Sequence, residues 1–279
     1  MLYTPTKEAL EAHLEWLYTL TQNPAHSGYP LYCDGILGKA DFFQRLRQGL
    51  QDSSRELLFF EINGQLQGCI QFFYLDADRY LQTECFCIAH GTEAALTEFL
   101  KHVRARYQGY TLYLGFPKRN TAAIAFLSEN GWVCLEEAYH DVFFLENYIP
   151  TPQDPRIISV TRENFPEFQA LHTLYEEDMY WNSQRLYRDL ERWDIRLYQE
   201  SGNILGALLC REEEIFAVEY QGGIFREEIY KALLSAVLND LKSCGKNHLL
   251  FLQDGESQAA ALSLGFACAG EYALYTKTI

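Results

Sequence analysis

The sequence has few basic residues: 23 lysines and arginines stand against 38 aspartates and glutamates, which gives a net charge of −15. No run of lysine or arginine forms a basic stripe, so this balance argues against binding a nucleic-acid backbone by bulk electrostatics. No apolar stretch approaches the length that spans a bilayer. The N-terminal run MLYTPTKEALEAHLEWL carries acidic residues within its apolar pattern, unlike a signal or transit peptide. We therefore expect a cytoplasmic protein that has neither a membrane nor a nucleic-acid partner.

Several catalytic and metal-binding motifs are also missing. The sequence has no GxxxxGK[ST], GxSxG or HExxH pattern. None of its eight cysteines forms a CxxC pair, and its seven histidines do not cluster near them, so we expect no zinc site and no other metal. Cys85 and Cys87 alternate with Phe86 in an apolar run, which places both thiols on one face of a strand. Buried, reduced cysteines are the simplest interpretation.

What the sequence does contain is a repeat. Its 279 residues are 48% hydrophobic and 15% aromatic, enough for two domains with packed cores. NGQLQG at 63–68 and SGNILG at 201–206 have glycines in the same two places, and each lies between apolar runs of strand type. Both predict a β-hairpin with a glycine turn.

A second pattern also recurs. Each half ends in a strand, a short turn, a helix of small residues, a glycine–aromatic step and a final β segment; the first copy contains RNTAAIAFLSENGW at 119–132. The order of elements is roughly ααβββαβαββ in each half. The proline-rich segment 146–156 indicates the linker. We therefore predict two similar α/β domains, 1–150 and 151–279.

This order, the glycine hairpin and the glycine–aromatic ending together resemble the GCN5-related N-acetyltransferase family, once in each half. The resemblance implies two tandem domains, each a mixed, mostly antiparallel sheet with one splayed parallel pair, flanked by helices. It also implies that the pantetheine arm of acetyl-CoA enters between the fourth and fifth strands. The pyrophosphate of this co-substrate would lie on free N–H groups at the start of the next helix.

By that resemblance, the cofactor residues of the first half lie at the start of this helix and ahead of the small-residue helix. They are Ile88, Ala89, His90, Gly91, Thr92, Ala94, Ala95, Asn120 and Ala123. The corresponding helix start in the second half carries Glu227 and Glu228, whose charge opposes phosphate. We therefore expect the first half to bind acetyl-CoA in preference to the second.

Asn120 has two interpretations that can coexist. It matches the asparagine that lies close to the CoA arm in the family, and it is also a plausible helix N-cap. Asp254 stands at the corresponding place in the second half.

The catalytic residues are less regular. The tyrosine that often protonates the leaving thiolate in the family is replaced by Leu127 and Ala261. Tyr139 or Tyr272 can substitute for it, or can simply pack on a strand face. Glu84, on the fourth strand of the first half, is the candidate general base; an outward-facing strand residue is the alternative.

Two functions remain open. The first is an acetyl-CoA-dependent N-acetyltransferase, whose small-molecule or peptide amine would attack the thioester directly. The second is a non-catalytic binding or dimerising protein on the same fold. The segment 23–39 corresponds to the region that covers the acceptor in the family, so Tyr29 and Tyr32 can contact an acceptor or pack. A homodimer is possible in either case.

Overall fold

The computed structural model covers residues 1–279 and describes every backbone position and every side chain except that of Asp178. The chain divides into two compact units. The first unit comprises Met1–Glu137 and Gly270–Ile279, and the second comprises Ala138–Ala269. No helix among the described residues is both long enough and apolar enough to cross a membrane.

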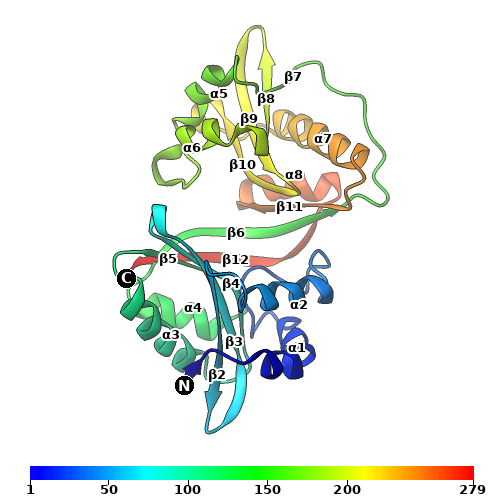
Figure 1. Ribbon diagram of the computed structural model, residues 1–279. Coiled ribbons are helices and arrows are strands. Elements are labelled where there is room, and N and C mark those ends of the chain that lie inside the picture. The colour runs from blue at the N-terminus through cyan, green and yellow to red at the C-terminus, as the bar shows by residue number, and fades with distance from the viewer. The chain divides into compact units, whose positions relative to one another are not determined.

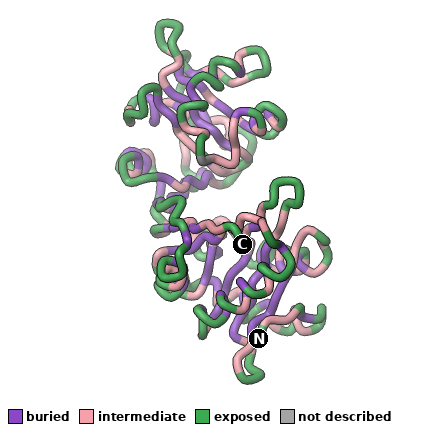
Figure 2. Tube along the Cα trace, turned by 90° about the vertical axis from the view of Figure 1, so that its left-hand side faces the viewer, coloured by how far each residue is buried: buried purple, intermediate pink, exposed green. Residues whose placement is uncertain are grey.

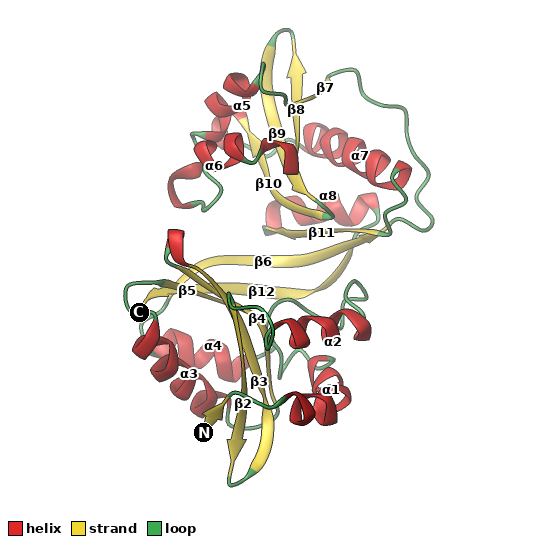
Figure 3. Ribbon diagram, viewed as in Figure 1, coloured by secondary structure: helices red, strands yellow, loops and turns green.

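The sheet of the first unit has the strand order β1-β2-β3-β4-β5-β12, and only β4 and β5 run parallel. Helices α1 and α2 cover one face of the sheet, and α3 and α4 cover the other (Figures 1 and 3). The strands are β1 (Leu2–Tyr3), β2 (Arg55–Ile62), β3 (Gln65–Leu75), β4 (Tyr80–Ile88), β5 (Thr111–Pro117) and β12 (Ala267–Thr278). The helices are α1 (Lys7–Thr21), α2 (Lys39–Gln48), α3 (Thr92–Arg106) and α4 (Thr121–Glu129).

The second unit repeats this architecture with the strand order β6-β11-β10-β9-β8-β7, in which only β10 and β11 are parallel. Its strands are β6 (Val133–Phe144), β7 (Ile157–Ser159), β8 (Asp194–Glu200), β9 (Asn203–Arg211), β10 (Glu214–Tyr220) and β11 (His248–Gln253). Its helices are α5 (Phe165–His172), α6 (Ser183–Arg188), α7 (Glu227–Ser243) and α8 (Gly255–Leu264). The repeat that the sequence predicts is therefore present in the fold.

Burial on both faces explains the apolar runs of the strands. In β2, Leu57 and Phe59 pack under α1 and α2, whereas Leu58 and Phe60 join the core on the other face. Successive strand residues point to opposite faces, so a strand covered on both sides reads as a continuous apolar run. Figure 2 shows the buried strands at the centre of each unit.

The two predicted glycine hairpins are confirmed. Asn63 and Gly64 both have positive φ, 52° and 76°, between β2 and β3. Ser201 and Gly202 repeat this with 51° and 81° between β8 and β9. Two successive positive φ values match the twist of the flanking strands, which is why asparagine or glycine is favoured there.

The final strands are exchanged between the two halves of the chain. Strand β6 follows α4 in sequence, yet Tyr139 pairs with Gln253 of β11. Conversely, Tyr272 of β12 pairs with Pro117 of β5. The first compact unit therefore ends at Glu137 and resumes at Gly270, and the linker 146–156 lies inside the second unit. Because the halves are repeats, the alternation of apolar and polar residues in each final strand fits the sheet edge of either half. This pattern therefore does not predict which sheet the strand joins.

Candidate functional site

The parallel strands of the first unit separate after a short paired stretch. β4 pairs with β5 only as far as Gln82 and Tyr113. Next along β4, Glu84 is an extra residue, because Thr83 and Cys85 pair with consecutive residues of β3. Such a bulge bends the strand and increases its twist. The splayed pair that the family resemblance implies is therefore present, and it opens at Glu84.

The loop between α1 and α2 enters this opening. The segment His26–Tyr29, which we call the inserted segment, forms an antiparallel bridge with β4. The N–H of Gly28 donates to the Phe86 carbonyl at 2.7 Å, and the N–H of Ile88 donates to the His26 carbonyl at 2.9 Å. The hydrogen-bonding edge of β4 that faces the opening is thus used by the chain itself.

The inserted segment is bound from the β5 side as well. The N–H of Tyr29 donates to the Gly115 carbonyl at 2.8 Å. A Cβ atom at Gly28 would lie 2.9 Å from the Phe86 Cβ and 3.2 Å from the Gly115 carbonyl oxygen. Only glycine fits there, so the inserted segment packs tightly between β4 and β5.

Asn120 holds the inserted segment in place. Its Oδ1 accepts the N–H of Ala123 at 3.2 Å and so caps α4, and its Nδ2 donates to the Ser27 carbonyl at 3.0 Å. Asn120 and Ala123 are both fully buried. The N-cap interpretation is therefore confirmed. The role of Asn120 beside a CoA arm stays a prediction, and its Nδ2 is bonded to Ser27 in this structure.

The other predicted cofactor residues lie together at the end of β4 and the start of α3. Gly91 is the N-cap of α3 with φ 75°, and α3 begins at Thr92. His90, Gly91 and Ala94 are exposed, as an anion site at a helix N-terminus requires. Ile88, Thr92 and Ala95 are buried, while Ala89, which is partly buried, donates its N–H to the Gln67 carbonyl. The phosphate end of the predicted site is open, but the pantetheine end is filled.

Glu84 points away from β5. Its carboxylate, 12% exposed, accepts hydrogen bonds from Arg55 Nε at 3.0 Å and from Gln71 Nε2 at 2.9 Å. Arg55 and Gln71 lie on β2 and β3, on the opposite side of β4 from the splayed opening. The carboxylate that we expected to serve as a base is thus engaged in an ion pair, and its catalytic role stays a prediction.

Strand exchange separates the two predicted catalytic residues. Tyr139 belongs to the second unit, where its ring lies beside Gly255 at the start of α8. Glu84 belongs to the first unit. The equivalent tyrosine of the first unit is Tyr272, whose ring packs over Gly115 and meets the Tyr29 ring at 5.3 Å. The two predicted catalytic residues therefore do not share one unit.

The second unit has its own splayed pair. β10 and β11 pair only at Glu214 and Ile215, and Phe216 is the extra residue at the bulge. Among the described residues, no main-chain segment bridges β10 and β11 as His26–Tyr29 bridges β4 and β5. Instead, the Tyr175 side chain bonds the main chain at the end of β10: its hydroxyl accepts the Tyr220 N–H at 3.1 Å and donates to the Tyr220 carbonyl at 2.5 Å.

A buried phenol lies at this end of β10. The Tyr220 side chain is 8% exposed, and its hydroxyl has no hydrogen-bond partner among the described residues. Burial raises the pKa of Tyr220, and the Asp254 and Glu256 carboxylates at the start of α8 raise it further. The hydroxyl therefore stays protonated and keeps a donor for a ligand.

The start of α7 lines an open pocket of about 610 Å³, formed by Arg226, Glu227, Glu228 and Lys231. The charge of each glutamate is offset by a neighbouring cation. Arg226 pairs with Glu228 at 3.0 Å, and Lys231 pairs with Glu227 at 2.6 Å. The sequence analysis expected the charge of these two carboxylates to oppose phosphate; in the structure each of them pairs with a cation, and the expectation stays a prediction.

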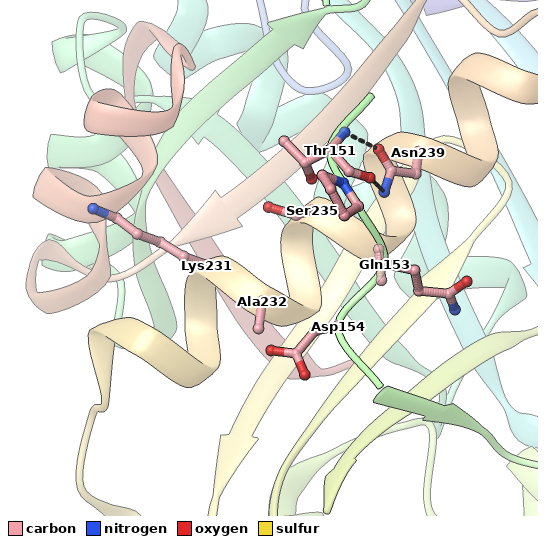
Figure 4. A pocket seen from close by; sticks show the side chains of 9 residues that line it. Thr151, Gln153, Asp154, Lys231, Ala232, Ser235 and Asn239 are labelled. Atoms are coloured by element: carbon pink, nitrogen blue, oxygen red, sulfur yellow. Dashed lines mark hydrogen bonds between the residues drawn. The ribbon is translucent and has the colours of Figure 1, made fainter. Parts of the chain in front are cut away.

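A second groove of about 210 Å³ lies between the linker and α7 (Figure 4). Asn239 bonds the Thr151 backbone twice, accepting from its N–H at 3.0 Å and donating to its carbonyl at 2.9 Å. These bonds fasten the linker to α7, and the two charged lining residues form ion pairs elsewhere, Asp154 with Arg156 and Lys231 with Glu227. We assign this groove a structural role.

The sequence analysis missed a buried ion pair in the second unit. His172 Nδ1 lies 2.6 Å from Glu219 Oε1, and its Nε2 lies 2.9 Å from the Trp181 carbonyl. Burial lowers the pKa of His172, but Glu219, together with the Trp181 carbonyl and Glu176, outweighs this effect and raises the pKa above its ordinary value. Both ring nitrogens are engaged, so the pair fastens α5 to β10. No sequence motif predicts this pair, because His172 and Glu219 are 47 residues apart.

No protein-family model matches this sequence, and no curated protein matches it significantly. Solved structures do match. A GCN5-related N-acetyltransferase from Sphaerobacter thermophilus superposes with a TM-score of 0.63 at 16% identity, covering 99% of this chain and 95% of that one. A tandem GNAT protein from the clavulanic acid biosynthesis pathway gives 0.52 at 13%, covering 99% and 98%.

A third structure is the glucosamine N-acetyltransferase region of a fungal multi-domain GH3 β-N-acetylglucosaminidase. It gives a TM-score of 0.60 at 12% identity and covers 99% of this chain but 38% of that one. At these low sequence identities, the superpositions establish the architecture of the chain and do not establish its activity. Each unit of this chain has the same element order and a splayed parallel pair. The chain therefore has the fold of the GCN5-related N-acetyltransferases.

Proposed function

We propose that this protein is an acetyl-CoA-dependent N-acetyltransferase and that its second unit binds the acetyl donor. One observation carries the assignment to the second unit. The inserted segment fills the splayed opening of the first unit, whereas at the corresponding edge of β10 the Tyr175 hydroxyl bonds the Tyr220 N–H and carbonyl. A side chain can rotate away from an arriving ligand more readily than a main-chain segment bonded on both sides can leave. The sequence analysis favoured donor binding by the first half, whereas the geometry favours the second unit.

The residues of the second unit fit the donor at both ends. Arg226 and Lys231, beside the first turn of α7, would hold the pyrophosphate together with the free N–H groups of the helix. The unpartnered Tyr220 hydroxyl would donate a hydrogen bond to the pantetheine arm. A buried donor without a partner is costly, and a ligand acceptor would satisfy it.

The reaction requires two proton movements. The attacking amine loses a proton as its nitrogen bonds to the thioester carbonyl, and the departing thiolate gains one. Tyr139, beside Gly255 in the second unit, is the candidate acid for the thiolate. Glu84 would serve as the base only if the donor bound in the first unit instead. The net charge of −15 would attract a cationic amine acceptor.

Calorimetric titration of the full chain with acetyl-CoA tests the assignment. Tyr220→Phe should weaken binding about fivefold, because one neutral hydrogen bond contributes about 1 kcal/mol. Tyr198→Phe is the matched control: its hydroxyl, on β8, is also buried without a partner. A charge-reversal pair then compares the two helix starts. Arg226→Glu should abolish binding, and His90→Glu should leave it unchanged.

The opposite result for this pair of variants would place the acetyl donor in the first unit.

The inserted segment and the ion pair of Glu84 with Arg55 favour a second candidate, a non-catalytic protein on the same fold. Under the enzyme proposal, acetyl-CoA at one hundred times its dissociation constant stabilises the chain by about 2.7 kcal/mol. An unchanged melting temperature together with no binding heat would support the non-catalytic candidate.

A further inference from the structure

Three cysteines meet beneath α1 and α2 in the first unit. Cys85 and Cys87 share one face of β4, as their alternation predicts, and Cys69 of β3 lies directly opposite Cys87. The Cys69 sulfur is 3.5 Å from that of Cys87 and 3.9 Å from that of Cys85. All three Sγ atoms lie within 4.8 Å of one another, and all three residues are buried. We call Cys69, Cys85 and Cys87 the thiol triad.

The spacing of the triad is that of a ligand set. Three sulfurs arranged in a plane around one ion, each at about 2.3 Å from it, lie about 4.0 Å apart. The separations of 3.5 Å and 3.9 Å from Cys69 lie within about half an ångström of this geometry, and the Cys85–Cys87 separation is at most 4.8 Å. The thiols are free and form no disulfide.

Two hydroxyl groups near the triad have no partner among the described residues. Ser27, in the inserted segment, pairs with Cys87 in an antiparallel bridge, so both side chains lie on the same face. Its buried Oγ makes no hydrogen bond. The Tyr32 hydroxyl, in the same hydrophobic cluster, is also buried and unpartnered. Orphaned oxygens beside three thiols indicate a missing bonding partner.

A metal ion bound by the three thiols would replace their protons and release them to solvent.

We propose that the thiol triad is a binding site for a thiophilic d¹⁰ cation, Zn²⁺ or Cu⁺, with Cys69, Cys85 and Cys87 as ligands. Soft thiolate ligands select these ions. Three thiolates alone suit three-coordinate Cu⁺, whereas Zn²⁺ would need a fourth ligand to reach the tetrahedral geometry that it prefers. The sequence did not reveal the site, because Cys69 joins the other two thiols only through the pairing of β3 with β4. The site is independent of the proposed transferase function.

The test uses the full chain without its surface thiols, so that any ion retained belongs to buried cysteines. Serine replaces the four exposed cysteines, Cys33, Cys134, Cys244 and Cys268. This parent keeps the triad and Cys210. It is exposed to Zn²⁺ or Cu⁺ without oxygen, both in the native state and during refolding, because the triad is covered in the folded chain. Excess ion is removed with a chelator, and metal per chain is measured by mass spectrometry.

We expect about one ion per chain for one of the two metals, with a thiolate charge-transfer band if it is Cu⁺ and a raised melting temperature. Cys69→Ala and Cys87→Ala should each lose the ion, and Cys210→Ala, which removes a lone buried thiol of the second unit, should keep it. Circular dichroism confirms that each variant folds. A folded parent that retains neither ion overturns the proposal, even if the alanine variants misfold. Retention by folded Cys69→Ala overturns it as well.

Discussion

Replacing Gly28 by alanine should destabilise the first unit through a single added methyl group. That carbon would lie 2.9 Å from the Phe86 Cβ and 3.2 Å from the Gly115 carbonyl oxygen, both on strands that cannot easily move. Overpacking of this kind costs about 1–3 kcal/mol. At roughly 2–4 °C per kcal/mol for a chain of this size, the melting temperature should fall by roughly 2–12 °C.

Thermal unfolding followed by circular dichroism measures the loss, and amide hydrogen exchange locates it. In the wild type the Gly28 and Tyr29 amides should be protected, because they donate to β4 and β5; in the variant this protection should fall. Gly38→Ala, in the same loop, is the control, since its added carbon meets only Asp41, at 3.4 Å. If Gly28→Ala were as stable as Gly38→Ala, the inserted segment would not be packed between the strands.

Three further predictions concern single contacts. Asn120→Asp keeps the acceptor that caps α4 but loses the donor to the Ser27 carbonyl. Urea unfolding should show a free energy of unfolding that is lower by about 1–3 kcal/mol. An unchanged free energy would mean that this hydrogen bond does not stabilise the first unit. Tyr139→Phe should lower kcat with little change in donor affinity once an amine acceptor is found, and an unchanged kcat would exclude the phenol as the acid. The raised pKa of His172 implies that its pairing with Glu219 stabilises the fold fully below about pH 6.5. This stabilisation is lost as the pH rises through the pKa of His172 in the folded state. Unfolding curves from pH 6 to 9 should show this decline, and His172→Gln should abolish it.

The sequence by itself determined the local structure and the repeat. Asn63-Gly64 and Ser201-Gly202 adopt the left-handed turns that their residue types favour. Asn120 caps α4, and Cys85 and Cys87 share one strand face, because caps and strand alternation depend on neighbours within a few residues. The splayed parallel pair follows from the family resemblance, and the structure contains it in both units.

Only the tertiary structure decided which distant groups meet. It joined Cys69 to Cys85 and Cys87, turned Glu84 toward Arg55, and inserted His26–Tyr29 between β4 and β5. It also exchanged the final strands, so that Tyr139 lies in the second unit although it shares the first half of the sequence with Glu84. A residue pattern records the face on which a side chain lies, with period 2 or 3.6. It does not record which strand edge or loop will cover that face, because that choice depends on the packing free energy of the whole chain.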